Sequence, residues 1–153
     1  MPSEINTGAI GVSYPPVVYA VGREKVREYA RAVGETDPLH LEPDAARARG
    51  YADVVAPPMF AVVYAGLAIA QPLHDPAVGI DFAHMVHGGQ EFRWGPLVVA
   101  GDEIATTAGV TDIAERRGML FYIFATESVN QRGDTVCSGV WTNIVRPPQE
   151  PAS

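Results

Sequence analysis

Residues 54–73 read VVAPPMFAVVYAGLAIAQPL and contain no charged residue. Within this stretch, residues 59–70 are apolar on every side of a helix except at Tyr64 and Gly66. A surface helix has one apolar stripe, so we expect a core helix of about three turns, buried along its whole length. A membrane span needs about 20 continuous apolar residues, whereas prolines bracket this shorter run.

The composition predicts one globular domain rather than two. The chain has 153 residues, of which 47% are hydrophobic and 19% charged, which is enough to fold around a single core. A net charge of −7 argues against a nucleic-acid binder. No secretory signal is visible, and the single Cys137 cannot form an internal disulfide, so we expect a cytoplasmic protein that binds neither nucleic acid nor membranes.

Basic residues are concentrated within residues 23–49. They could form a solvated helix face balanced by Glu24 and Glu28. They could also form a landing site for an anionic carrier, either the phosphates of coenzyme A or an acidic carrier protein. The six residues are Arg23, Lys25, Arg27, Arg31, Arg47 and Arg49.

The order of elements predicts an α+β fold, an antiparallel sheet with its helices on one face. A short strand at 17–21 precedes an amphipathic helix that ends before Gly34, and a second short helix begins at Pro43. Strands follow at 84–94, 103–115, 119–130 and 135–145, joined by glycine-containing turns. The domain spans 15–146, and we expect residues 1–14 and 147–153 to be flexible ends.

A loop with acid–base side chains follows the first helix. Residues 34–40 read GETDPLH and so place two carboxylates, Glu35 and Asp37, near His40. Such a loop beside a buried helix can form an acid–base site. It can equally be a capping turn, with Asp37 bonded to nearby amides and His40 merely packed.

This loop resembles the Gly-Asp-x-Asn-Pro-Leu-His motif of the MaoC-like, R-specific enoyl-thioester hydratases. The segments GREKVREYARAVG, DVVAPPMF, VHGGQEFRW and VVAGDEI extend the resemblance over about residues 15–146. It is nearest to the single-domain actinobacterial fatty-acid-synthase-type dehydratases. The resemblance implies a hot-dog fold, in which the sheet wraps the central helix and two such domains pair through their sheets.

The resemblance also implies which residues are functional. The family's catalytic histidine falls on His40, its aspartate falls on Glu35, and its asparagine falls on Asp37, a possible supporting carboxylate. The family's helix N-terminus holds the thioester oxygen with a backbone amide. Because Pro57 and Pro58 have no N–H, the expected donors are Met59 and Phe60.

Four further residues are expected to line the substrate channel, whereas two histidines are expected to have no role in catalysis or metal binding. Tyr51, Tyr64, Gly88 and Gly89 are the channel candidates, with the glycine pair marking a bulge or a close approach of an acyl chain. His84 and His87 are three apart on a strand and so lie on opposite faces. We therefore expect no metal site, and the implied chemistry needs no cofactor.

The resemblance implies reversible dehydration of (3R)-3-hydroxyacyl thioesters to trans-2-enoyl thioesters carried on coenzyme A or acyl carrier protein. The active form would be a homodimer, or a heterodimer with a second hot-dog subunit. A non-catalytic acyl-binding subunit is the strongest alternative, because Glu35 and the proline pair depart from the motif. A hot-dog thioesterase is disfavoured, since many of these enzymes place a carboxylate on the central helix and residues 54–73 contain none.

Overall fold

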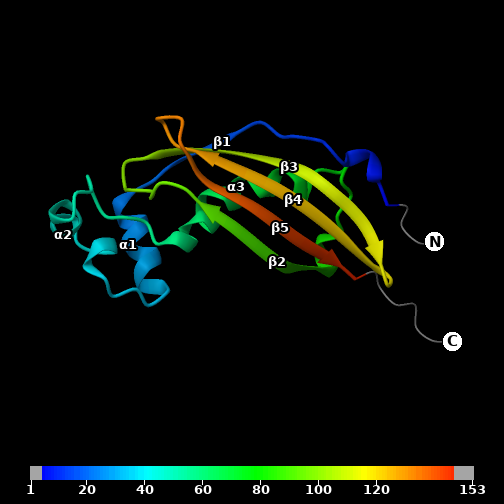
Figure 1. Ribbon diagram of the computed structural model, residues 1–153. Coiled ribbons are helices and arrows are strands. Elements are labelled where there is room, and N and C mark those ends of the chain that lie inside the picture. Colours follow the sequence, from blue (N-terminus) through cyan, green and yellow to red (C-terminus); the bar gives the residue numbers. More distant parts are fainter. Residues whose placement is uncertain (1–4, 147–153) are drawn as a thin grey trace.

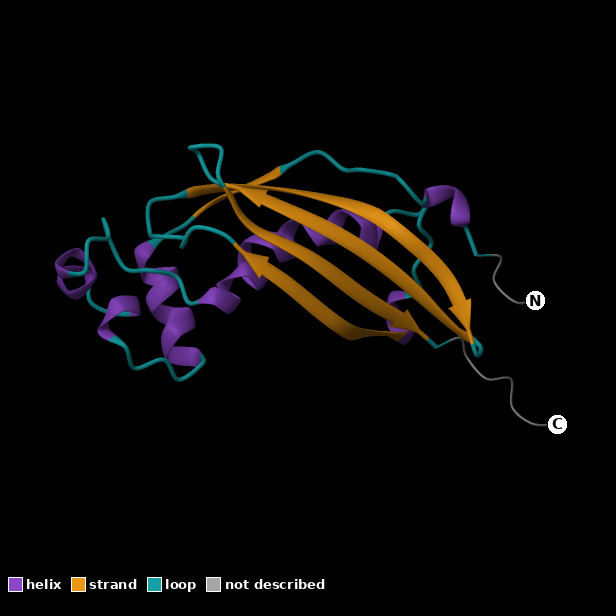
Figure 2. Cartoon of the chain, viewed as in Figure 1, coloured by secondary structure: helices purple, strands orange, loops and turns teal. Residues whose placement is uncertain are grey.

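A computed structural model describes residues 5–146, in which five strands form one antiparallel sheet. The strand order is β1-β3-β4-β5-β2, so the last strand of the chain lies between β4 and the early strand β2. The sheet curves around a single long helix, α3 (Figures 1 and 2). The strands are β1 (Val17–Ala20), β2 (Met85–Trp94), β3 (Glu103–Arg116), β4 (Met119–Val129) and β5 (Thr135–Val145).

Alternation along the strands decides which face of the sheet packs on α3. In β4 the side chains of Tyr122, Phe124 and Thr126 are buried while their neighbours are partly exposed. Phe124 lies opposite Trp141 of β5, and the Trp141 indole donates a hydrogen bond to Thr126 Oγ1 at 2.9 Å on the same inner face. This period of two is what a sheet buried on one side requires.

The helix α3 (Ala61–His74) follows a short 3₁₀ turn, η3 (Pro58–Phe60). The prediction of burial along its whole length is wrong, because Met59 is 46% and Leu67 48% exposed. Only the face that packs on the sheet is fully covered, with Ala65 at 0% exposure. The helix is also longer than predicted, because Pro72 lies inside its final turn, where it removes only one intrahelical hydrogen bond.

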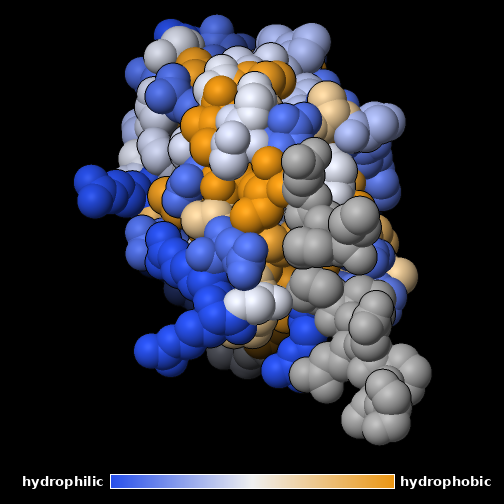
Figure 3. All heavy atoms as spheres, turned by 90° about the vertical axis from the view of Figure 1, so that its right-hand side faces the viewer, coloured by the Kyte–Doolittle hydropathy of each residue, from blue (hydrophilic) through white to orange (hydrophobic). Residues whose placement is uncertain are grey.

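Helices α1 (Arg23–Ala32) and α2 (Pro43–Ala48) lie beyond one end of the sheet, where α3 begins (Figure 1). Both end as predicted at a glycine in the left-handed region, Gly34 with φ +77° and Gly50 with φ +91°. At the opposite end, apolar side chains form a band between hydrophilic ones (Figure 3).

The segment before β1 is not the loose end expected from its composition. Residues 5–14 include a 3₁₀ turn, η1 (Thr7–Ala9), and then run along the edge of β3. Gly11 N–H donates to Val110 O at 2.8 Å and Tyr14 N–H to Ala108 O at 2.9 Å. The tail at 147–153 lies outside the described residues. Within them, no helix has the length and hydropathy needed to span a bilayer.

Candidate active site

The loop after α1 begins with a Schellman turn that fixes where Glu35 leaves the helix. Gly34 N–H donates to Arg31 O at 3.2 Å, and Glu35 N–H donates to Ala30 O at 2.8 Å, which satisfies carbonyls left free at the helix end. The Glu35 side chain is half-buried. Within residues 5–146 no hydrogen bond joins its carboxylate to His40.

Asp37 caps the 3₁₀ turn η2 (Pro38–His40) that carries His40. Its Oδ1 accepts the Leu39 N–H at 2.9 Å, and Arg49 Nη1 lies 2.9 and 3.1 Å from the two carboxylate oxygens. The hydrogen bond from the Leu39 amide and the adjacent Arg49 guanidinium hold the pKa of Asp37 below its ordinary value. Asp37 therefore has the contacts of a capping residue, and its carboxylate is fully engaged.

His40 is oriented by a backbone carbonyl. Its Nδ1 lies 2.6 Å from Val55 O. A carbonyl oxygen can only accept a hydrogen bond, so Nδ1 carries the proton and, in the neutral ring, Nε2 is left as an acceptor. The preceding residue, Leu39, is buried in a small apolar cluster with Ala46 and Val55. That cluster anchors η2, and the imidazole is held in the form that a general base needs.

The start of α3 offers one of the two predicted amide donors. Phe60 N–H donates to Pro57 O at 2.8 Å within the 3₁₀ turn, so it is already used and the expectation for Phe60 is wrong. For Met59 N–H no hydrogen-bond acceptor is found within residues 5–146. An amide without a partner at a helix N-terminus favours a ligand oxygen that carries negative charge.

An apolar pocket of about 390 Å³ lies beside this helix start. Tyr64, which is 2% exposed, forms part of its wall, and burial raises the pKa of the Tyr64 phenol far above its ordinary value. Trp94, at the end of β2, forms part of another wall and donates its indole N–H to Pro58 O at 2.9 Å. Other walls come from Ala56, Pro57, Phe60, Pro96, Leu97, Val98 and Val136.

Three of the predicted channel residues lie outside this pocket. Tyr51 packs against the cluster around Leu39. Gly88 forms the predicted bulge, where the register of β2 shifts between His87 and Gly89. A Cβ on Gly88 would meet the end of the Ile144 side chain, so the close neighbour of this glycine is a side chain of the protein itself.

The remaining histidines do not form a metal centre among residues 5–146, where no group of three His, Cys, Asp or Glu side chains is placed to hold an ion. His84 is bonded to Asp81 through a 2.7 Å contact from Nδ1 to Oδ2. His87 lies edge-on to Trp141, with ring centroids 6.0 Å apart. Both histidines have local packing or surface roles.

The basic residues of α1 and α2 are mostly paired with acidic neighbours. The shortest pair joins Arg23 Nη2 to Asp53 Oδ2 at 2.6 Å. This hydrogen-bonded contact raises the pKa of Arg23 and lowers that of Asp53. Such pairing supports the solvated-face interpretation of this segment over the anion-landing one. The other pairs are Lys25–Glu28, Arg27–Glu24, Arg47–Asp44, Arg47–Asp53 and Arg49–Asp37.

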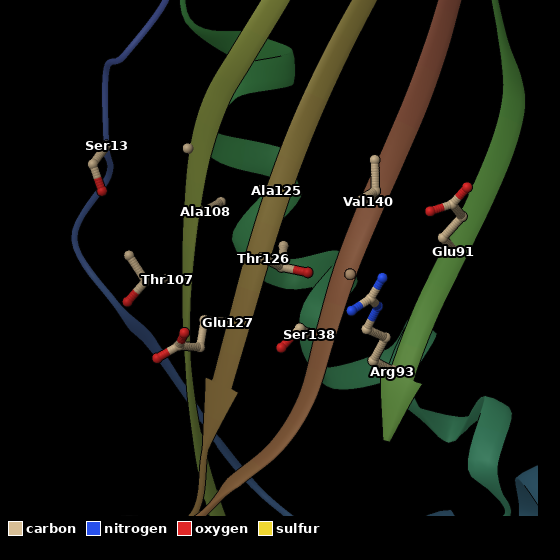
Figure 4. A pocket seen from close by; sticks show the side chains of 12 residues that line it. Ser13, Glu91, Arg93, Thr107, Ala108, Ala125, Thr126, Glu127, Ser138 and Val140 are labelled. Atoms are coloured by element: carbon tan, nitrogen blue, oxygen red, sulfur yellow. The ribbon is translucent and has the colours of Figure 1, made fainter. Parts of the chain in front are cut away.

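A second hollow, of about 470 Å³, lies on the outer face of the sheet, away from α3 (Figure 4). Its floor is built from small side chains such as Ala125, and Glu91, Arg93 and Glu127 stand around it. None of the predicted site residues lines it. The acid–base loop follows α1 beyond one end of the sheet, and the apolar pocket lies beside the start of α3.

A model of the FAS1-like dehydratase domain region matches residues 8–138. The chain belongs to this FAS1-like dehydratase family. A UPF0336 protein of Clavibacter michiganensis subsp. michiganensis (strain NCPPB 382) is 48% identical over 128 residues, which cover 84% of this chain and 86% of the relative. That name describes no activity, so this relative supports the evolutionary relationship but gives no information on the reaction.

Similarity to solved structures places this chain among the hot-dog proteins. A MaoC-like dehydratase has a TM-score of 0.79 and 29% identity over 92% of this chain, which spans only 43% of that larger chain. The HadBC (3R-hydroxyacyl-ACP dehydratase) complex of Mycobacterium tuberculosis has a TM-score of 0.78 and 26% identity, covering 94% and 99% of the two chains. The hot-dog fold expected from the sequence is confirmed.

The sequence did not reveal two features of the candidate site. One is the Val55 carbonyl that orients His40, because a backbone group leaves no mark in a pattern of side chains. The other is the pocket wall formed by Trp94 and Leu97. A signal for that wall existed, since a tryptophan followed by Gly95 and Pro96 ends an alternating strand with a large apolar side chain.

Proposed function

We propose that this protein catalyses the reversible dehydration of (3R)-3-hydroxyacyl thioesters to trans-2-enoyl thioesters. The observation that carries the proposal is the 2.6 Å contact between His40 Nδ1 and Val55 O. This contact leaves Nε2 of the neutral ring free to accept a proton at a loop that also presents Glu35. Membership of the FAS1-like dehydratase family and the similarity to the HadBC (3R-hydroxyacyl-ACP dehydratase) complex support the same reaction class.

In the hydration direction, Glu35 and His40 hold and polarise one water molecule. The hydroxyl of that water adds to C3 of the enoyl thioester, and a proton is delivered to C2. All three atoms of the water are thereby accounted for in the product. Negative charge develops on the thioester oxygen as an enolate, and the Met59 amide is the donor available to it. Dehydration follows the same path in reverse.

The apolar pocket is suited to the acyl part of the substrate. It lies beside the helix start, where Pro58 and Phe60, the two neighbours of Met59 in the chain, form part of its wall, and its walls are almost entirely apolar. Ligand sites of this kind use apolar walls for affinity and a few polar groups for orientation. In this arrangement Tyr64 and Trp94 contact the acyl chain, while the pantetheine of coenzyme A or of acyl carrier protein leads out to solvent.

The active form is proposed to pair with a second hot-dog subunit, identical or different. Within the described residues, β2 pairs only with β5, so its other edge is open, and open edges are prone to pair. Leu67 on α3 and Val86 on β2 are large apolar side chains that are 48% and 60% exposed. The HadBC structure is a complex of hot-dog dehydratase subunits, which supports an assembly of this kind.

One observation favours a second candidate, a non-catalytic acyl-binding subunit. The Glu35 carboxylate makes no hydrogen bond to His40 within residues 5–146, whereas the apolar pocket is fully formed. Long contacts between catalytic groups are common before substrate binds, so this geometry is compatible with an enzyme as well. The two candidates differ in whether the protein acts alone.

The test is hydration of short and medium trans-2-enoyl-coenzyme A thioesters by the protein purified alone, followed as loss of enoyl-thioester absorbance. We expect turnover by the wild type and little by a folded His40→Ala variant. Activity that appears only after a second hot-dog subunit is added would assign the acyl-binding role. Absence of turnover both alone and with such a subunit would overturn the proposed reaction.

A further inference from the structure

A buried carboxylate that the proposed reaction does not use lies behind the site. Asp102, 5% exposed, lies in the turn before β3. Its Oδ2 accepts the Val99 N–H at 2.9 Å, and its Oδ1 accepts from Gln131 Nε2 at 2.9 Å and from Arg132 Nη1 at 3.4 Å. Gln131 Oε1 in turn accepts the Glu103 N–H at 3.0 Å. Asp102 thereby ties this turn to the loop between β4 and β5.

The backbone fixed by Asp102 pairs with the segment that orients His40. Residues 98–100 run antiparallel to residues 54–56, with Val55 opposite Val99. Two backbone hydrogen bonds, of 2.8 and 3.0 Å, join the segments on either side of that pair. Segment 54–56 therefore takes its position from segment 98–100, which is held by the carboxylate.

The polar groups of Val55 point away from that pairing, because backbone groups alternate in direction along a strand. Val55 N–H donates to Leu39 O at 3.0 Å, and Val55 O accepts from His40 Nδ1 at 2.6 Å. Residues 54–56 are thus the middle layer of a small ladder, with 98–100 on one edge and 39–40 on the other. A shift of the Val55 peptide moves the hydrogen-bond acceptor of His40.

We propose that Asp102 is a positioning residue for His40. It acts through Val99 and Val55 and touches neither the substrate nor the imidazole. Its task is to hold the Val55 carbonyl where it keeps the His40 proton on Nδ1. The consequence for turnover rests on the proposed function, whereas the consequence for the His40 tautomer does not.

Removal of the Asp102 carboxylate has two measurable consequences. In Asp102→Ala the partly buried Val99 N–H loses its acceptor, and the ladder relaxes. The neutral His40 ring then becomes a mixture of the two tautomers, which long-range ¹H–¹⁵N spectra resolve at about pH 8, above the ordinary histidine pKa. Turnover falls by about 10- to 100-fold, the scale expected when a catalytic group is slightly misplaced. His40→Gln identifies the His40 signals by their loss.

The matched control is Asp134→Ala, which removes a carboxylate from the same β4–β5 loop. Asp134 bonds Asn130 Nδ2 at 3.3 Å and pairs with Arg132 Nε at 3.5 Å, but does not contact segment 98–100. Its His40 spectrum and turnover should match the wild type. The double variant Asp102→Asn/Gln131→Glu reverses the donor and acceptor between these two side chains, keeps an acceptor for Val99, and should restore both readouts.

If Asp102→Ala does not fold, Asp102→Asn is used as the test variant instead. The side-chain NH₂ that this substitution introduces and the Gln131 NH₂ are both donors, so the hydrogen bond between these two side chains is lost. A folded Asp102→Ala or Asp102→Asn protein with a wild-type His40 spectrum would overturn the proposal. So would an equal spectral change in Asp134→Ala. If the wild type hydrates no thioester, the proposed reaction fails, and the His40 spectra still decide the role of Asp102.

Discussion

At the residue scale, the two carboxylates of the loop at 34–40, Glu35 and Asp37, have different contacts, which the sequence alone does not show. Asp37 is engaged by the Leu39 amide and by Arg49, so its contacts are those of a structural residue. Glu35 is half-buried with no hydrogen bond to its carboxylate in the described chain. Of the two, Glu35 is therefore the carboxylate without a competing contact within residues 5–146, and we predict that it is the one that acts with His40.

If Glu35 and His40 act in one proton-transfer step, their effects on turnover will not add. We expect His40→Ala and Glu35→Gln each to lower kcat by about 10²–10⁴, the range for general acid–base groups. The double variant should be little worse than the poorer single one. Steady-state hydration kinetics on the two single variants and the double variant measure this, with circular dichroism to confirm that all are folded.

Two further substitutions identify the working carboxylate. Glu35→Asp restores the acid of the resembled motif and should retain or raise turnover. Asp37→Asn should leave most of the turnover, because the amide oxygen can still cap Leu39. A loss in Asp37→Asn as large as that in Glu35→Gln would mean that Asp37 is the acid.

The pH dependence of stability separates the structural role of Asp37 from a catalytic one. Its pKa is lowered from the ordinary value of 3.8 in the folded state. Its contribution is therefore fully present above the unfolded pKa and is lost as pH falls through the folded pKa. We expect the gap in melting temperature between wild type and Asp37→Ala to be constant near neutral pH and to close as the pH falls below about 4, the ordinary aspartate pKa.

The comparison for this experiment is Asp44→Ala, which removes a side chain that is 98% exposed and paired with Arg47 on the same helix. An exposed pair of this kind contributes little to stability, so this variant should melt close to the wild type throughout. If Asp37→Ala also melts with the wild type near neutral pH, the capping role is wrong.

At the element scale, the helix α3 shows what hydropathy can and cannot predict. Residues 59–70 are apolar on all sides, and the sequence correctly marked a central helix. It did not show that the sheet covers only one face, because Ala65 and Leu67 have the same apolar character while their exposures are 0% and 48%. Which face is covered depends on the curvature of strands far away in the sequence.

The strands were predicted within one or two residues because their alternation is local. The ladder of residues 5–14 along β3 was missed, since it uses the backbone of Gly11 and Tyr14 and leaves no side-chain period. The same limit applies to the site. The sequence could propose His40 and Glu35 as candidates, and their role stays a prediction. The Val55 carbonyl and the engaged Phe60 amide could not be proposed, because they are set by tertiary pairing and by the proline-started turn.

The buried face of α3 can be tested by placing a charge on it. Ala65→Asp buries an unpaired carboxylate against the sheet and should cost several kcal/mol, enough to prevent soluble expression. Leu67→Asp, two residues on, points its carboxylate to the uncovered side and should leave the isolated fold intact. Soluble yield and thermal melting compare the two variants. A stable Ala65→Asp protein would contradict the packing of α3.

At the scale of the whole molecule, the described part of a single protomer has an unpaired sheet edge and exposed apolar side chains. The sheet ends in an open β2 edge, and two large apolar side chains, Leu67 of α3 and Val86 of β2, are 48% and 60% exposed. The cap formed by α1, α2 and the acid–base loop lies at the end where α3 begins (Figure 1). We propose that a second subunit pairs with the open β2 edge and packs on the exposed face of α3.

We therefore expect the protein to sediment as a dimer, or as a dimer of dimers, at micromolar concentration rather than as a 16.4 kDa monomer. Leu67→Asp places a charge in the proposed contact and should weaken the dimer by at least about 100-fold, which corresponds to about 2.7 kcal/mol. Val18→Asp is the matched control, because Val18 is 61% exposed on the short strand β1 at the other edge of the sheet, and this variant should remain dimeric. Sedimentation velocity on the three proteins distinguishes the cases. A monomeric wild type would refute pairing through this surface, and dissociation by Val18→Asp but not by Leu67→Asp would move the interface to the β1 edge.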